Sequence, residues 1–162
     1  MSAKQRSGFR RPVLCLVISA IGVAALVAAG PAPGVVGGKN ELVAHMNGQK
    51  AVPMGDPDAK GTADITLKPR AGKVCFDITF TGLSPDNPFA GHIHKGAKGV
   101  AGPIKVPLYE GAPRPSPWTG CTEQQAVTEE LMNRIRSHPE RFYVNLHNAQ
   151  FGDGAIRGQL RQ

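Results

Sequence analysis

The sequence lacks the features that mark a nucleic-acid-binding protein. Its lysine and arginine residues are scattered rather than gathered in a run, and aromatic residues make up only 6% of the 162 residues. Nucleic-acid surfaces usually combine a basic stripe or patch with a recognisable binding motif. The formal net charge of +7 therefore does not indicate a nucleic-acid partner.

Sequence patterns of common enzyme sites are missing as well. Ser84, Ser116 and Ser137 have neither a nucleophile-elbow context nor a triad context. The glycine-rich residues 96–102 lack both a following helical pattern and the lysine of a phosphate-binding loop. The sequence therefore gives no support for hydrolase or nucleotide chemistry, and it favours a binding or structural protein over an enzyme.

The long apolar run of the chain lies at its N-terminus. Residues 1–11 carry four basic residues and no acidic residue, and the apolar residues 13–29 follow, ending in Val27, Ala28 and Ala29. A basic start, an apolar core and small residues at the end are typical of a secretory signal peptide. We therefore expect residues 1–29 to be a signal peptide and the protein to act in the cell envelope or outside the cell. An uncleaved membrane anchor is the alternative, although the run is short for a spanning helix.

Removal of the signal peptide changes both the charge and the cysteine count. The remaining chain has 15 basic and 12 acidic residues, a net charge of +3. Residues 30–39 are rich in glycine and are expected to form a flexible tether, and residues 40–162 are expected to form one domain. That domain contains Cys75 and Cys121, which we expect to form a disulfide in an oxidising compartment rather than two free buried thiols. Such a bridge contributes at most about 4–5 kcal/mol in the chain-entropy model.

Alternating apolar and polar residues predict a chain of short strands. The clearest case is residues 73–81, where Val74, Phe76, Ile78 and Phe80 fall on one face. Further strands are expected at residues 40–46, 62–67, 89–95, 104–109, 142–147 and 155–160. One short helix is expected after Thr128, and residues 111–120, with three prolines, are expected to be irregular. This pattern predicts an antiparallel β-sandwich or barrel.

Three of the five histidines lie in two of the predicted strands. His92 and His94 point to the same face because side chains alternate along a strand, and His147 joins them if the two strands are neighbours. Imidazole suits copper or zinc, and Arg157 on the following strand is a candidate for attracting an anion. The competing interpretation is that these histidines are half-buried groups that hydrogen-bond to loop carbonyls.

Several segments together resemble the CHRD domain, which is named after chordin. These are residues 91–96 (Gly-His-Ile-His-Lys-Gly), 142–147 (Phe-Tyr-Val-Asn-Leu-His) and 154–160 (Gly-Ala-Ile-Arg-Gly-Gln-Leu), with residues 48–53 and 61–63 fitting its opening segment. The resemblance covers about residues 40–160. It implies an antiparallel immunoglobulin-like β-sandwich, loosely similar to copper–zinc superoxide dismutase, with one short helix predicted from the pattern above.

The resemblance also frames the expected function. In the dismutase, a His-x-His strand supplies two copper ligands, so the comparison implies a metal site at His92, His94 and His147. The sequence departs from a dismutase centre because it has no histidine between His94 and His138 and therefore no zinc cluster. We expect a secreted CHRD-domain binding or structural module with an unknown protein or envelope partner. The alternative is a copper-binding or superoxide-dismutase-like protein that uses the three histidines.

Overall fold

The protein is described by a computed structural model that places residues 39–83, 86–122 and 127–162. The expected signal peptide, residues 1–29, and nearly all of the expected tether lie outside these ranges. Within them, no helix combines the length and apolar character needed to cross a membrane.

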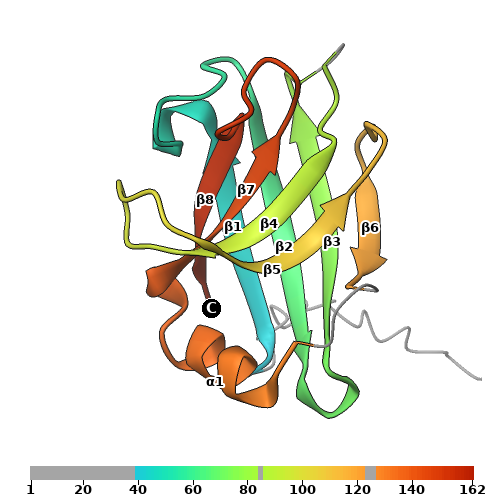
Figure 1. The fold of residues 1–162 in the computed structure, drawn as a ribbon, viewed down its shortest axis with the longest axis vertical. Coiled ribbons are helices and arrows are strands. Elements are labelled where there is room, and N and C mark those ends of the chain that lie inside the picture. The colour runs from blue at the N-terminus through green and yellow to red at the C-terminus, as the bar shows by residue number, and fades with distance from the viewer. Residues whose placement is uncertain (1–38, 84–85, 123–126) are drawn as a thin grey trace, which may run out of the picture. The chain divides into compact units, whose positions relative to one another are not determined.

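In the described residues eight strands, all paired antiparallel, form a single sheet (Figure 1). In sheet order they are β5 (Ile104–Glu110), β4 (Ala90–Lys95), β7 (Phe142–His147), β8 (Ile156–Arg161), β1 (Glu41–Asn47), β2 (Lys60–Lys68), β3 (Lys73–Thr81) and β6 (Trp118–Cys121). The two edge strands approach each other, because the ring of Tyr109 on β5 lies 4.9 Å from the ring of Trp118 on β6. The sheet therefore curls into a near-barrel, and the prediction of an antiparallel all-β fold with one short helix is confirmed.

The core lies on the concave side of the sheet. On β3 the four predicted apolar residues are buried, and on β1 the residues Leu42, Ala44 and Met46 are buried in the same alternating way. Trp118 is only 2% exposed and packs edge-on against Phe76 at 5.9 Å between ring centroids. Each fully buried large apolar side chain contributes about 1.5–3 kcal/mol. Trp118 therefore closes the core where the two sheet edges meet.

The helical segments are short and lie between strands. Helix α1 (Glu129–Ser137) begins as predicted, with Thr128 as N-cap, whose hydroxyl accepts a hydrogen bond from the backbone N–H of Leu131. It buries Met132 and Ile135, while Leu131 is half-buried. The part of the chain that the structure describes also contains three 3₁₀ turns: η1 (Gly48–Lys50), η2 (Pro69–Ala71) and η3 (Pro139–Arg141).

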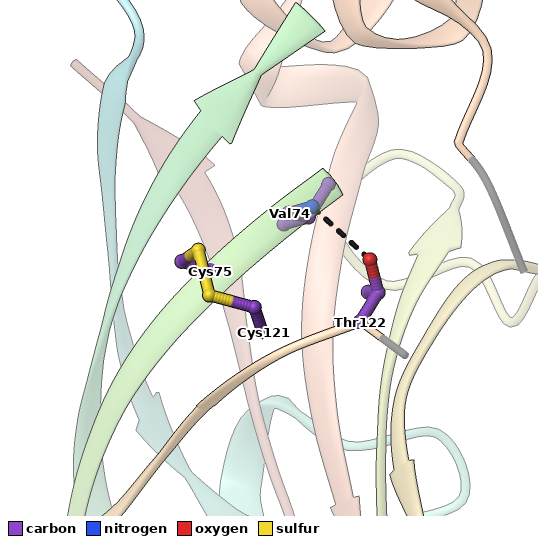
Figure 2. Close-up of a disulfide and its surroundings, with 4 residues drawn as sticks. All are labelled: Val74, Cys75, Cys121 and Thr122. Carbon is purple, nitrogen blue, oxygen red and sulfur yellow. Dashed lines mark hydrogen bonds between the residues drawn. A yellow bond between two sulfur atoms is a disulfide. The ribbon is translucent and has the colours of Figure 1, made fainter. Parts of the chain in front are cut away.

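The region expected to be irregular contains a strand, so that part of the prediction is wrong at its C-terminal end. Strand β6 pairs with β3 alone, with Cys75 directly opposite Cys121. These two cysteines form the predicted disulfide, and beside it the backbone N–H of Val74 donates to the hydroxyl of Thr122 at 3.2 Å (Figure 2). A four-residue strand that contains Gly120 has too little alternation to be recognised, and it is held by the covalent bond and by Trp118.

Candidate metal centre

The pairing of β4 with β7 brings the three predicted histidines to one place. In this register Ala90 lies opposite His147, and His94 lies opposite Tyr143. His92, His94 and His147 all point away from the apolar core, on the outer face of the sheet. Side chains alternate along a strand, and a residue directly next to each histidine belongs to the core. The two strands are therefore neighbours, which is the condition on which the convergence of the three histidines depended.

The three imidazoles are close and shielded. The Nδ1 atom of His92 lies 3.2 Å from the Nε2 atom of His147, and one nitrogen from each of the three rings lies within 4.8 Å of the others. The histidines are only 5–7% exposed, although they face outward. Two loops contact the rings, because Gly102 in residues 96–103 and Gly152 in residues 148–155 each accept a hydrogen bond from a histidine.

These loops fix the tautomers of two histidines. The Nδ1–H of His94 donates to the carbonyl of Gly102, and the Nδ1–H of His147 donates to the carbonyl of Gly152, each at 2.9 Å. Since a carbonyl only accepts, each Nδ1 must carry the proton in the neutral ring. The Nε2 atoms therefore keep their lone pairs, and Nε2 of His94 is buried with no hydrogen-bond partner.

The third histidine is oriented by a carboxylate. Nε2 of His92 lies 2.8 Å from a carboxylate oxygen of Glu110, at the end of β5. A neutral His92 that donates from Nε2 to Glu110 has an unprotonated Nδ1. This Nδ1 atom faces Nε2 of His147, which is also unprotonated, so two acceptor nitrogens face each other. Two acceptors at this distance need a cation between them, either a proton or a metal ion. A carboxylate behind a ligating imidazole is also the usual arrangement at metal sites.

The protonation of the cluster favours metal binding at neutral pH. Burial lowers the pKa of His94 from 6.5 to about 4, with the hydrogen bond to Gly102 acting in the opposite direction. Burial also lowers the pKa of His147. Because a metal ion binds the neutral imidazole, these shifts keep two ligands available in mildly acidic solution.

Arg157 lies behind this cluster rather than in it. Its guanidinium carbon sits 3.5 Å from the ring centroid of Tyr143, and Tyr143 in turn stacks on His94 at 4.8 Å between ring centroids. The guanidinium donates to the carbonyls of Ala97 and Val100, at 2.7 and 3.0 Å. These contacts tie down the loop over His94. Attraction of an anion by Arg157 stays a prediction, and its contacts direct it to the loop rather than to the three histidines.

The competing interpretation of the histidines also finds support. His94 and His147 do hydrogen-bond to loop carbonyls, and Asn145 donates to the carbonyl of Asp153 at 3.0 Å, which ties the β7–β8 hairpin together. The two interpretations are compatible because these bonds use Nδ1 of His94 and of His147 and leave the Nε2 lone pair of each ring available to a metal ion. Sequence reasoning missed Glu110 and Tyr143, since neither stands in a recognisable ligand spacing.

Comparison with known families agrees with the fold. The CHRD domain model matches residues 42–160, which include nearly every strand and all three histidines. The chain therefore belongs to the CHRD domain family. No curated protein and no solved structure matches it.

Proposed function

We propose that the chain is an exported CHRD-domain binding module without catalytic activity, and that its three-histidine cluster holds one transition-metal ion. Export is supported by the basic and apolar pattern of residues 1–29. The disulfide between Cys75 and Cys121 supports an oxidising compartment, because such bonds rarely persist in the cytoplasm.

The observation that carries the metal proposal is the direction of the lone pairs. Three buried imidazoles turn one nitrogen each toward a shared space, while their outer nitrogens bond to two carbonyls and one carboxylate. A buried acceptor without a partner, such as Nε2 of His94, costs about 1–3 kcal/mol. A metal ion satisfies all three nitrogens at once, whereas a proton satisfies at most two.

The donor set favours copper or zinc. Imidazole suits both ions, and copper(II) binds more tightly than zinc at a given nitrogen site. The carboxylate of Glu110 accepts a hydrogen bond from His92 and orients that ring, as such groups do behind ligating imidazoles. Among the described residues the cluster has no fourth His, Cys, Asp or Glu ligand. We therefore propose binding of the ion rather than superoxide turnover.

Metal loading of purified protein tests the proposal. The protein is incubated with copper(II) or zinc(II), desalted and subjected to elemental analysis, beside a His92→Ala/His94→Ala variant. The control is His45→Ala/His138→Ala, which removes two exposed histidines outside the cluster. The wild type and the control should retain about one ion per chain, and the cluster variant almost none. Equal metal content in all three proteins would refute the metal site, provided that circular dichroism shows each of them folded.

A further inference from the structure

A basic pocket lies on the outer face of β1 and β8. It encloses about 250 Å³ and is lined by His45, Lys50, Lys98, Gly99, Arg157, Gln159 and Arg161. Four of these residues are cationic and none is acidic. We refer to these seven residues as the basic pocket.

Strand alternation and one loop assemble this pocket. Arg157, Gln159 and Arg161 alternate on β8 with the core residues Ile156 and Leu160, so all three face outward. β1 lies next to β8, and its residue His45 also faces outward. Lys50 is the last residue of η1, and Lys98 lies in the loop after β4, so the cations come from distant parts of the sequence.

The residues that line the pocket are basic or neutral. None of the ion pairs among the described residues includes Lys50, Lys98, Arg157 or Arg161. Asp64, which also faces outward, lies across Val43 from Arg161, so the Cα atoms of Asp64 and Arg161 are two strand spacings or about 10 Å apart. Four cations therefore line a small pocket whose described lining contains no carboxylate.

Arg157 is a buried and firmly held part of this pocket. It is 2% exposed, and its described donors go to neutral oxygen atoms, on Ala97, Val100 and Gln159. These bonds, with the stacking contact to the ring of Tyr143, hold the guanidinium in place through partners that carry no negative charge. Burial accordingly lowers the pKa of Arg157.

A second hollow extends the surface beside the pocket. It shares His45 and Lys50, adds Lys60, and its lining also includes three threonines and a serine. This hollow is open and encloses about 490 Å³. A ligand that carries an anionic group in the basic pocket therefore has room for a neutral or polar remainder.

We propose that the basic pocket binds a phosphate group. A phosphate carries up to two negative charges and several acceptor oxygens, which arginine and lysine donors recognise as charge-assisted hydrogen bonds. The flanking cations also raise the local concentration of such an anion. The same chemistry serves free phosphate and the phosphate of an anionic lipid headgroup. The site is distinct from the histidine cluster, since the ring of Tyr143 lies between Arg157 and His94.

Titration with inorganic phosphate tests the pocket. Metal-free protein is titrated at constant ionic strength, and backbone amide shifts are followed by NMR. The amides of Lys50, Lys98 and Gly99 should shift saturably. A Lys98→Glu/Arg161→Glu variant should bind at least tenfold more weakly, and an Arg70→Glu/Lys73→Glu variant, with the same change in charge on the β2–β3 hairpin, less than twofold more weakly. Equal losses in both variants, or no saturable shift in the wild type, would overturn the proposal.

Vesicle sedimentation identifies the source of the phosphate. Phosphatidylglycerol vesicles are compared with phosphatidylcholine vesicles for the wild type and both variants. Selective sedimentation with phosphatidylglycerol that only the pocket variant loses assigns the site to a lipid headgroup. Saturable shifts with inorganic phosphate but no sedimentation assign it to soluble phosphate. Sedimentation that both variants lose equally reports net charge alone and counts against a lipid ligand at the pocket.

Discussion

The buried His94 makes the stability of the metal-free domain depend on pH. Its pKa is about 4 in the folded protein and 6.5 in the unfolded chain. Above pH 6.5 the residue is neutral in both states and contributes no pH dependence. Between pH 6.5 and about 4 the unfolded state takes up a proton that the folded state refuses, so the free energy of unfolding falls as the pH falls. Below about pH 4 both states are protonated and the contribution levels off.

The size of this effect follows from the shift. At 1.36 kcal/mol per pKa unit, a shift from 6.5 to about 4 corresponds to about 3 kcal/mol lost between pH 7 and pH 4. A loss of this size is a large fraction of the stability of a small domain, which is typically about 5–15 kcal/mol. The domain should therefore become fragile in mild acid unless a metal ion occupies the cluster.

Urea unfolding of metal-free protein at pH 7, 6, 5 and 4 measures the effect. Carboxylates and His147 titrate in the same range, so the informative quantity is the difference in free energy of unfolding between the wild type and His94→Gln. Glutamine still offers an N–H donor toward Gly102 but does not titrate. The free energy of unfolding of the wild type minus that of His94→Gln should fall by about 3 kcal/mol from pH 7 to pH 4. A difference that stays constant to within about 0.5 kcal/mol would show that burial does not set the pKa of His94.

Three further predictions follow from particular contacts. Glu110→Ala removes the carboxylate behind His92 and should weaken metal affinity by about 10- to 100-fold in a competition titration, and an unchanged affinity would separate Glu110 from the site. Thiol titration of the unreduced, denatured protein should find neither Cys75 nor Cys121 free. Replacing both cysteines with serine should lower the free energy of unfolding by about 2–5 kcal/mol, and titration of both Cys75 and Cys121 in the unreduced, denatured protein would contradict the pairing. Mass spectrometry of the exported protein should place its first residue at Gly30, and an intact N-terminus would indicate a retained anchor.

Much of the fold could be predicted because the core strands follow a period of two. Residues 73–81 were predicted with their observed bounds, since β-branched and aromatic residues alternate with polar ones over the whole strand. Pro107 correctly indicated an edge strand, because proline cannot donate to a neighbouring strand. Strand β6 could not be predicted, since it is four residues long and its placement depends on a disulfide to the distant Cys75 and on burial of its own Trp118.

The candidate site was predictable in its ligands but not in its supports. The spacing of His92 and His94 indicated a pair on one strand face, and the place of His147 in a second apolar strand indicated a third ligand. Glu110 reaches His92 through a pairing of β4 with β5 in which the register shifts next to His92, and no sequence spacing encodes such an irregularity. The basic pocket could not be predicted from the sequence either, because Lys50 and Arg161 come together only through the pairing of β1 with β8, strands from opposite ends of the domain.

The coordination of a bound ion is the most direct test of the proposed metal centre. Zinc K-edge X-ray absorption of the zinc-loaded protein should show three imidazole nitrogens at about 2.0–2.1 Å, and the His92→Ala/His94→Ala variant should lose this signal. A spectrum with fewer than two imidazole ligands, or one that is unchanged in the variant, would contradict the assignment of His92, His94 and His147 as a metal site.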